Sequence, residues 1–137
     1  MVALWVADKA DNRVLRVPAD TVAPVITKPT LANGKPIISK TKIKSLARII
    51  GTSVEAYTIA QVIYTVTYSS GKPAVTTTSP PVNATLFGPA LATPTTTPWE
   101  IKPLLPSKKG SRHTITVTGF DNNGNMSAPT IFTVKIG

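Results

Sequence analysis

The chain contains no cysteine and only one histidine, His113. The absence of cysteine excludes disulfide bonds, thiolate metal sites and cysteine nucleophiles. No apolar run approaches the roughly 18–20 residues that span a bilayer, so the sequence predicts no transmembrane helix and no membrane insertion. The hydrophobic fraction of 42% argues against wholesale disorder. A length of 137 residues fits one domain, or one domain with an appendage.

Acidic residues are also scarce. Six Asp and Glu stand against fifteen Lys and Arg, which gives a formal net charge of +9. Residues 28–48 contain six basic and no acidic side chains, and we take Lys40, Lys42, Lys44 and Arg48 as candidates for binding a polyanion. Such a surface attracts nucleic acid, anionic polysaccharide, a membrane face or an acidic partner. The alternative is that these residues only solvate a β-sheet and protect its edges.

Residues 102–112 form a second basic stretch without an acidic residue, and neither basic stretch contains Phe, Tyr or Trp. Proteins that bind nucleic acid usually add aromatic side chains for base stacking, or a groove-reading motif. We therefore expect no specific nucleic-acid binding. Anionic polysaccharide stays open as a partner.

The residues that are abundant favour β-structure and loops: the chain has 21 threonines and 13 prolines. Apolar residues recur mostly with a period of two, and turn-forming residues separate the alternating stretches. This pattern predicts an all-β fold, an immunoglobulin-like sandwich of two antiparallel sheets with almost no helix. The expected strands are residues 25–27, 36–39 (an edge strand), 42–50 (ending at Gly51), 61–68, 74–79, 99–105, 113–120 and 130–136.

Alternation within these strands also predicts the core. The residues that we expect to be buried are Ile43, Ile49, Tyr64, Val66, Ile115, Val117 and Val134. An aromatic residue in a sandwich usually belongs to the core, so Trp99 is expected there as well. The alternative for Trp99 is stacking on a sugar together with Trp5.

Two segments do not fit a compact sandwich. Residues 1–19 read as an N-terminal β-hairpin or the remnant of a preceding domain, and residues 20–137 as the sandwich. Residues 80–98 hold five prolines and five threonines, which predicts a long surface loop. Both segments carry apolar residues that need a cover, either from the same chain or from a neighbouring subunit. The candidates for docking on a partner are Leu4, Trp5, Leu15, Leu86 and Phe87.

Catalytic patterns are weak. A triad of Ser111, His113 and Asp121 lacks a nucleophile elbow, and we expect His113 to be an ordinary surface or strand-end residue. Glu55 and Glu100 would form a glycosidase pair only by coincidence. We therefore expect a protein without enzymatic activity.

The segment from Asp121 to Asn125 offers oxygen atoms from Asp121, Asn123 and Asn125. Calcium needs six to eight oxygens, several of them from carboxylates, so a tight turn is the expected structure and calcium the alternative. No other cofactor is indicated.

Residues 20–137 resemble the bacterial immunoglobulin-like domains of surface and secreted proteins. The resemblance rests on DTVAPVI at 20–26, AQVIYTV at 60–66, WEI at 99–101 and TITVTGFDNNGNMS at 114–127. Residues 4–17, with LWVAD followed by NRVLRV, resemble one repeat of an NHL β-propeller. The first resemblance implies a fold and little about function, because such sandwiches serve adhesion, carbohydrate binding, spacing and virion decoration alike.

We thus expect a non-catalytic structural or adhesive module of an extracellular, cell-surface or particle-surface assembly. The expected partners are other protein subunits or neighbouring domains, including a homo-oligomer. One alternative is a phage decoration or cement protein on a virion surface, suggested by the charge and by an N-terminus without an export signal. The other is a carbohydrate-binding module of an extracellular enzyme.

Overall fold

The computed structural model describes residues 4–8, 13–17, 21–38, 40–55, 59–70, 73–87, 95–105 and 108–137, the first two of these ranges by their backbone only. Their regular secondary structure consists of strands, as the alternation predicts. Within these ranges there is accordingly no helix that could cross a membrane.

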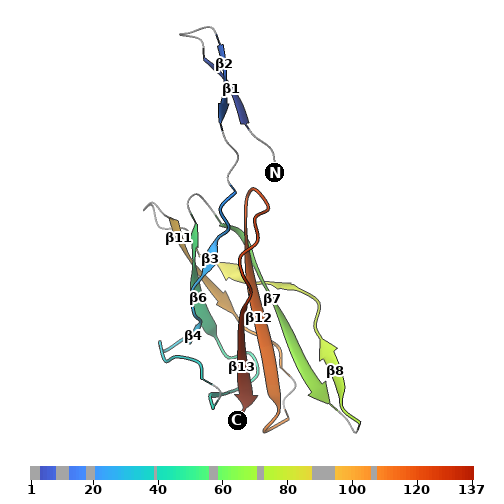
Figure 1. Ribbon diagram of the computed structural model, residues 1–137. Coiled ribbons are helices and arrows are strands. Elements are labelled where there is room, and N and C mark those ends of the chain that lie inside the picture. The colour runs from blue at the N-terminus through green and yellow to red at the C-terminus, as the bar shows by residue number, and fades with distance from the viewer. Residues whose placement is uncertain are drawn as a thin grey trace.

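Two sheets pack face to face (Figure 1). The first, called the β6–β11 sheet, has the order β10-β11-β6-β3, with β4 also paired to β6. Its pairings are antiparallel. Its strands are β3 (Val25–Ile26), β4 (Thr30–Leu31), β6 (Ile49–Glu55), β10 (Thr85–Leu86) and β11 (Thr95–Ile101).

The second, called the β7–β12 sheet, has the order β5-β13-β12-β7-β8, with β9 also paired to β7. Its pairings are antiparallel, as the alternation predicts, except that β5 pairs with β13 in parallel. Its strands are β5 (Lys42–Ile43), β7 (Ile59–Ser70), β8 (Val75–Thr78), β9 (Val82–Asn83), β12 (Arg112–Asp121) and β13 (Thr130–Ile136).

The N-terminal hairpin consists of β1 (Leu4–Asp8) and β2 (Arg13–Val17). The two strands are antiparallel, from the pair Leu4 and Val17 to the pair Asp8 and Arg13. They form a two-stranded sheet of their own, to which no described strand of the sandwich is added.

The core lies between the two sheets. All seven predicted core residues are buried, and so is Trp99, whose side chain is 0% exposed. The sugar-stacking alternative for Trp99 is therefore wrong. Among the described residues, the buried apolar side chains of the core are Ile37, Ile43, Ile49, Ile59, Val62, Tyr64, Val66, Trp99, Ile101, Leu105, Ile115, Val117, Val134 and Ile136.

The predicted single strand over residues 42–50 is wrong, because the chain changes sheets within it. After β5, Leu46 adopts a left-handed backbone with φ of 62° and donates its amide to Pro103 O at 3.0 Å. Ser45 holds this crossing in place, since its Oγ donates to Leu105 O at 2.9 Å and accepts from Leu105 N at 3.1 Å. β6 then continues through Gly51 instead of ending there.

The predicted loop over residues 80–98 is also partly wrong. It contains β9, β10 and the first part of β11, while residues 88–94 lie outside the described ranges. Pro98 is tolerated within β11 because its nitrogen, which has no hydrogen, faces the β10 side, and β10 has already ended at Leu86. This orientation follows from the oxygen of Pro98, which accepts a hydrogen bond from Phe87 N on that side.

Candidate polyanion-binding surface

Three of the predicted polyanion-binding residues are exposed at or beside β5, an edge of the β7–β12 sheet. They are Lys40, Lys42 and Lys44. The buried Ile43 anchors this segment in the core, so alternation turns Lys42 outward. Lys135 N donates to Thr41 O at 3.1 Å and holds the segment against β13.

The strand register brings two further cations to Lys42. Lys42 is the partner of Lys135 across the β5–β13 pair, and Lys135 is the partner of Arg112 across the β13–β12 pair. The neighbours Ile43, Ile136 and His113 all face the core, so alternation places the three cations together on the outer face. We call Lys42, Lys135 and Arg112 the basic row.

The turn before β12 adds charge at the end of this row. Gly110, with φ of 85°, forms the turn, and its amide donates to Ile136 O at 2.8 Å. The Lys135 side chain passes over this turn, since its Cε lies 4.0 Å from the position that a Cβ of Gly110 would take. Lys108 and Lys109 of the turn are both exposed. The basic row therefore continues into a turn with two more lysines.

Like charges at directly opposed positions of neighbouring strands destabilise a sheet. The basic row places three such charges across adjacent strands, which lie about 4.8 Å apart. In the part of the chain that the structure describes, both ion pairs are made by Glu100 on the other sheet, and none involves the row. The three cations therefore lie on one face without an acidic partner among the described residues.

A row of hydroxyl groups lies on the same face, two residues from the cations of β12 and β13, and continues across β7 and β8. Thr67 and Thr78 lie 3.0 Å apart through their Oγ1 atoms, and Thr114 and Thr133 lie 3.5 Å apart. Thr114 is also the register partner of Thr67, which joins the two pairs. This threonine row gives hydrogen-bond donors and acceptors beside the cations.

Arg48, the fourth predicted polyanion-binding residue, lies apart from the other three on the outer face of the β6–β11 sheet. Its Nε and Nη2 both donate to Glu100 Oε2, at 2.9 and 2.7 Å. These bonds raise the pKa of Arg48 and lower the pKa of Glu100. Lys102 Nζ lies 3.5 Å from Glu100 Oε1. Arg48 is therefore committed to an internal ion pair.

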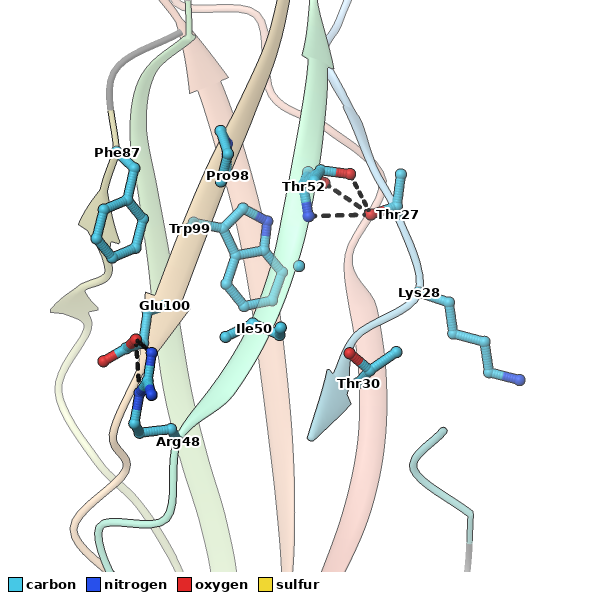
Figure 2. A pocket seen from close by; sticks show the side chains of 11 residues that line it. Thr27, Lys28, Thr30, Arg48, Ile50, Thr52, Phe87, Pro98, Trp99 and Glu100 are labelled. Atoms are coloured by element: carbon cyan, nitrogen blue, oxygen red, sulfur yellow. Dashed lines mark hydrogen bonds and ion pairs between the residues drawn. The ribbon is translucent and has the colours of Figure 1, made fainter. Parts of the chain in front are cut away.

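A groove of about 360 Å³ crosses this outer face (Figure 2). Its floor includes Ile50 and Pro98, and Figure 2 shows Phe87 on one side and Thr27 on the other. Thr27 closes its side firmly, because its Oγ1 accepts from Thr52 N at 3.0 Å. The groove is mostly apolar, with the Arg48–Glu100 pair at one end.

The predicted docking residues fall into two groups. Leu86 is partly buried against the core of its own chain and is thereby covered, whereas Phe87 is 46% exposed beside the groove. The side chains of Leu4, Trp5 and Leu15 lie outside the described part of the structure, so their docking on a partner stays a prediction.

His113 is the second residue of β12, so the expected strand-end position is confirmed, but at 1% exposed it is buried and is not a surface residue. Its ring packs against Tyr68 with centroids 5.5 Å apart, and burial lowers its pKa from 6.5. The Ser111 hydroxyl donates to Lys108 O at 2.7 Å, while His113 Nε2 lies 2.9 Å from Ser111 Oγ. Since the hydroxyl has one proton, Nε2 is the donor in the second contact.

The triad geometry is therefore not formed. His113 in this tautomer cannot accept the Ser111 proton through Nε2, and Asp121 lies eight residues further along the same strand, about 26 Å away. The two glutamates of the glycosidase pair also fail to meet. Glu55 is buried on the core side of β6, whereas Glu100 lies on the outer face of β11, where it binds Arg48.

The predicted tight turn after β12 is confirmed. Asp121 Oδ1 accepts from the amides of Asn123 and Asn125, each at 2.9 Å, and Asn125 Nδ2 donates to Asp121 Oδ2 at 2.7 Å. Gly124 has φ of 83°, as such a turn requires. The carboxylate thus serves as an acceptor for its own turn. Within the described ranges, no group of three or more acidic or histidine side chains is placed to hold a metal ion.

Sequence reasoning missed Lys135, and it did not connect Arg112, which belongs to the basic stretch 102–112, with Lys42. Alternation along β12 and β13 places both on the outer face, and this signal is present in the sequence. The register that aligns them with Lys42 is not, because the three residues come from three distant parts of the chain. No known protein-family model matches this chain, and no curated protein is similar enough to be considered a relative.

Proposed function

We propose that this chain is a non-catalytic adhesive module that binds an anionic polysaccharide through the basic row and the lysines of the adjoining turn. The observation that carries the proposal is the alignment of Lys42, Lys135 and Arg112 across three neighbouring strands, without an ion-pair partner in the described structure. Binding would replace mutual repulsion by charge-assisted hydrogen bonds.

The proposal includes the setting. The sandwich shape and the sequence resemblance to bacterial immunoglobulin-like domains support an extracellular, cell-surface or particle-surface module joined to other subunits or domains. A virion surface is the alternative setting. The high positive charge suits either setting, because it attracts anionic polymers wherever they are present.

Two features favour a polysaccharide over a nucleic acid. The described aromatic on the outer face of β12, Phe120, lies eight residues from Arg112, about 26 Å along the strand, and cannot stack on a base held there. The threonine row beside the cations instead offers hydroxyl groups, which match the hydroxyl and acid oxygens of a sugar polymer.

Heparin, as a defined anionic polysaccharide, tests the proposal. We expect binding to weaken linearly in log Kd against log salt concentration, because counterions are released on binding. K135A and R112A should each weaken binding and lower the salt slope by about one. K28A is the matched control. It removes the same charge as K135A, but Lys28 is exposed on the other sheet.

Equal losses from K28A and K135A would show that net charge alone binds heparin and would overturn the proposed site. Absence of heparin binding at low salt would overturn the function. Tighter binding to duplex DNA than to heparin at equal salt would replace the polysaccharide by nucleic acid.

A second candidate function, a carbohydrate-binding module of an extracellular enzyme, is favoured by the groove on the β6–β11 sheet. An exposed aromatic, Phe87, borders a mostly apolar depression that also contains threonine hydroxyls and the Arg48–Glu100 pair. Ligand sites typically combine these features. Titration calorimetry with neutral oligosaccharides tests it, with F87A expected to abolish binding and K135A to leave it unchanged.

A further inference from the structure

β8 forms an open edge of the β7–β12 sheet. Its four residues, Val75–Thr78, are all exposed, and Val75 is 62% exposed. Among the described strands, β8 pairs with β7 alone. Figure 1 shows it at the margin of the sheet, beside the end of β7. One side of its backbone is therefore without a strand partner in the described structure.

The hydrogen-bonding pattern shows which backbone groups face outward. Ser79 N donates to Val66 O at 2.8 Å, so Ser79 faces β7. Because antiparallel pairs alternate, Thr77 and Val75 also face β7, and the N–H and C=O groups of Thr76 and Thr78 point away from the sheet. These four groups are spaced to receive an antiparallel strand.

The other edges are shorter or guarded by charge. β5, β4, β3 and β10 have two residues each. Lysines lie at or beside β5, and Lys28 lies between β3 and β4. Lysines and very short strands are devices that block edge pairing. β8 has four residues and no charge, and it belongs to the segment 73–99, which has no charged side chain in a chain of net charge +9.

We propose that β8 pairs antiparallel with β8 of a second copy of this chain, about a two-fold axis at Thr77. Thr76 of each copy then exchanges two hydrogen bonds with Thr78 of the other, which gives four in total. Pro80 ends the pairing, since it has no N–H. A second copy is the favoured partner because the outward groups of Thr76 and Thr78 lie symmetrically about Thr77, so β8 is complementary to itself. Two molecules of charge +9 also repel least where both are uncharged, as they are at β8.

The dimer would also strengthen binding of a long polyanion, an inference that rests on the proposed function. A two-fold axis perpendicular to the sheet keeps the same face outward in both copies. Two basic rows then lie on one face of a continuous sheet, so one long polyanion can contact both. Two linked contacts bind a polymer more tightly than one. Pairing through a four-residue strand is small, so the dimer itself should be weak.

Sedimentation of the full chain from about ten micromolar to about one millimolar measures the dimer. T76P removes the outward N–H of Thr76 but leaves the ladder to β7, because that group faces away from β7. We expect it to raise the dimer dissociation constant about tenfold or more, through loss of two of four hydrogen bonds. T76V, which keeps the amide and the branched shape, is the matched control and should dimerise.

T77K is a second variant, which places two lysines opposite each other at the axis and leaves the backbone unchanged. T116K adds the same charge to the middle of the sheet and should not affect the dimer. Wild-type, T76V and T116K dimers with monomeric T76P and T77K would support the proposal. A monomeric wild type at the highest concentration, or an undiminished T76P dimer with native circular dichroism, would overturn it.

The effect of salt distinguishes β8 pairing from the polyanion binding of the proposed function. Added salt should strengthen the dimer, since it screens repulsion between two molecules of like charge. The same salt should weaken heparin binding. Loss of the dimer with intact heparin binding therefore refutes only β8 pairing, and the reverse refutes only the polyanion site. Binding of an unrelated extended peptide in place of a second copy would also overturn β8 self-pairing.

Discussion

The indole of Trp99 lies directly against the backbone of Gly51 on the neighbouring strand. A Cβ on Gly51 would lie 2.7 Å from Trp99 Cε2 and 2.9 Å from Cη2. The two residues are register partners of β11 and β6, and the absent side chain of Gly51 makes room for the largest side chain in the core. This explains why a glycine lies inside β6, where it would otherwise weaken a strand.

Gly51→Ala should therefore destabilise the fold by about 1–3 kcal/mol, because the added methyl group overpacks the core against the indole. Urea unfolding measures the change. Trp99→Phe should remove part of the clash, so the double variant should lose less stability than the sum of the two single variants. Additive losses would show that the alanine acts through something other than contact with Trp99.

Val117→Ala should cost about 1–3 kcal/mol, through lost transfer free energy and the cavity that remains. Val117 is 0% exposed at the centre of β12, between β7 and β13. Thr118→Ala, on the outer face of the same strand, is the control and should cost less. A loss below about 0.5 kcal/mol for Val117→Ala would contradict its place in the core.

The stability of the fold should decrease as the solution is acidified from pH 8 toward pH 5.5. Burial lowers the pKa of His113 in the folded chain below its ordinary 6.5, so the unfolded chain binds the proton more strongly. The contribution of neutral His113 to the unfolding free energy is therefore fully present above the pKa of His113 in the unfolded chain. It decreases as the pH drops through 6.5 and levels off below the pKa of His113 in the folded chain. Unfolding free energies across this range measure the effect.

His113→Gln provides the control, since His113 is the only histidine of the chain. The variant should flatten the dependence on pH between 8 and 5.5, whatever its effect on absolute stability. An unchanged slope would assign the pH dependence to another group.

Deletion of residues 1–17 should leave the sandwich folded, with an unfolding free energy within about 1 kcal/mol of the full chain. The reason is that β1 and β2 pair with each other, and no described strand of the sandwich joins their sheet. Circular dichroism and urea unfolding test this. An unfolded product would show that the hairpin belongs to the core. Loss of a dimer with an intact sandwich would assign self-association to the hairpin instead of β8.

The period-two pattern was sufficient to identify the longest strands and their buried faces. Along β12, Ile115 and Val117 alternate with threonines, and burial follows this alternation. The turn at Asp121 was also predictable, since an aspartate followed by asparagines and glycine forms it by local hydrogen bonds. These features depend on neighbours in the chain, which the sequence states directly.

Strand boundaries near glycine and proline were predicted less well, because tertiary contacts outweigh local preference there. β6 continues through Gly51 because the indole of Trp99 fills the space beside this glycine. Pro98 lies in β11 because β10 has ended on the side where Pro98 lacks an N–H. Neither fact can be read from the residues around Gly51 or Pro98.

Composition alone predicts a chain that is rich in β-structure, strongly basic and free of cysteine chemistry. Which basic residues lie together follows from strand pairing: β5 with β13 and β13 with β12 align Lys42, Lys135 and Arg112, while Glu100 holds Arg48 on the opposite sheet. Charge is a property of each residue, whereas a charged surface depends on the register between strands that are distant in sequence.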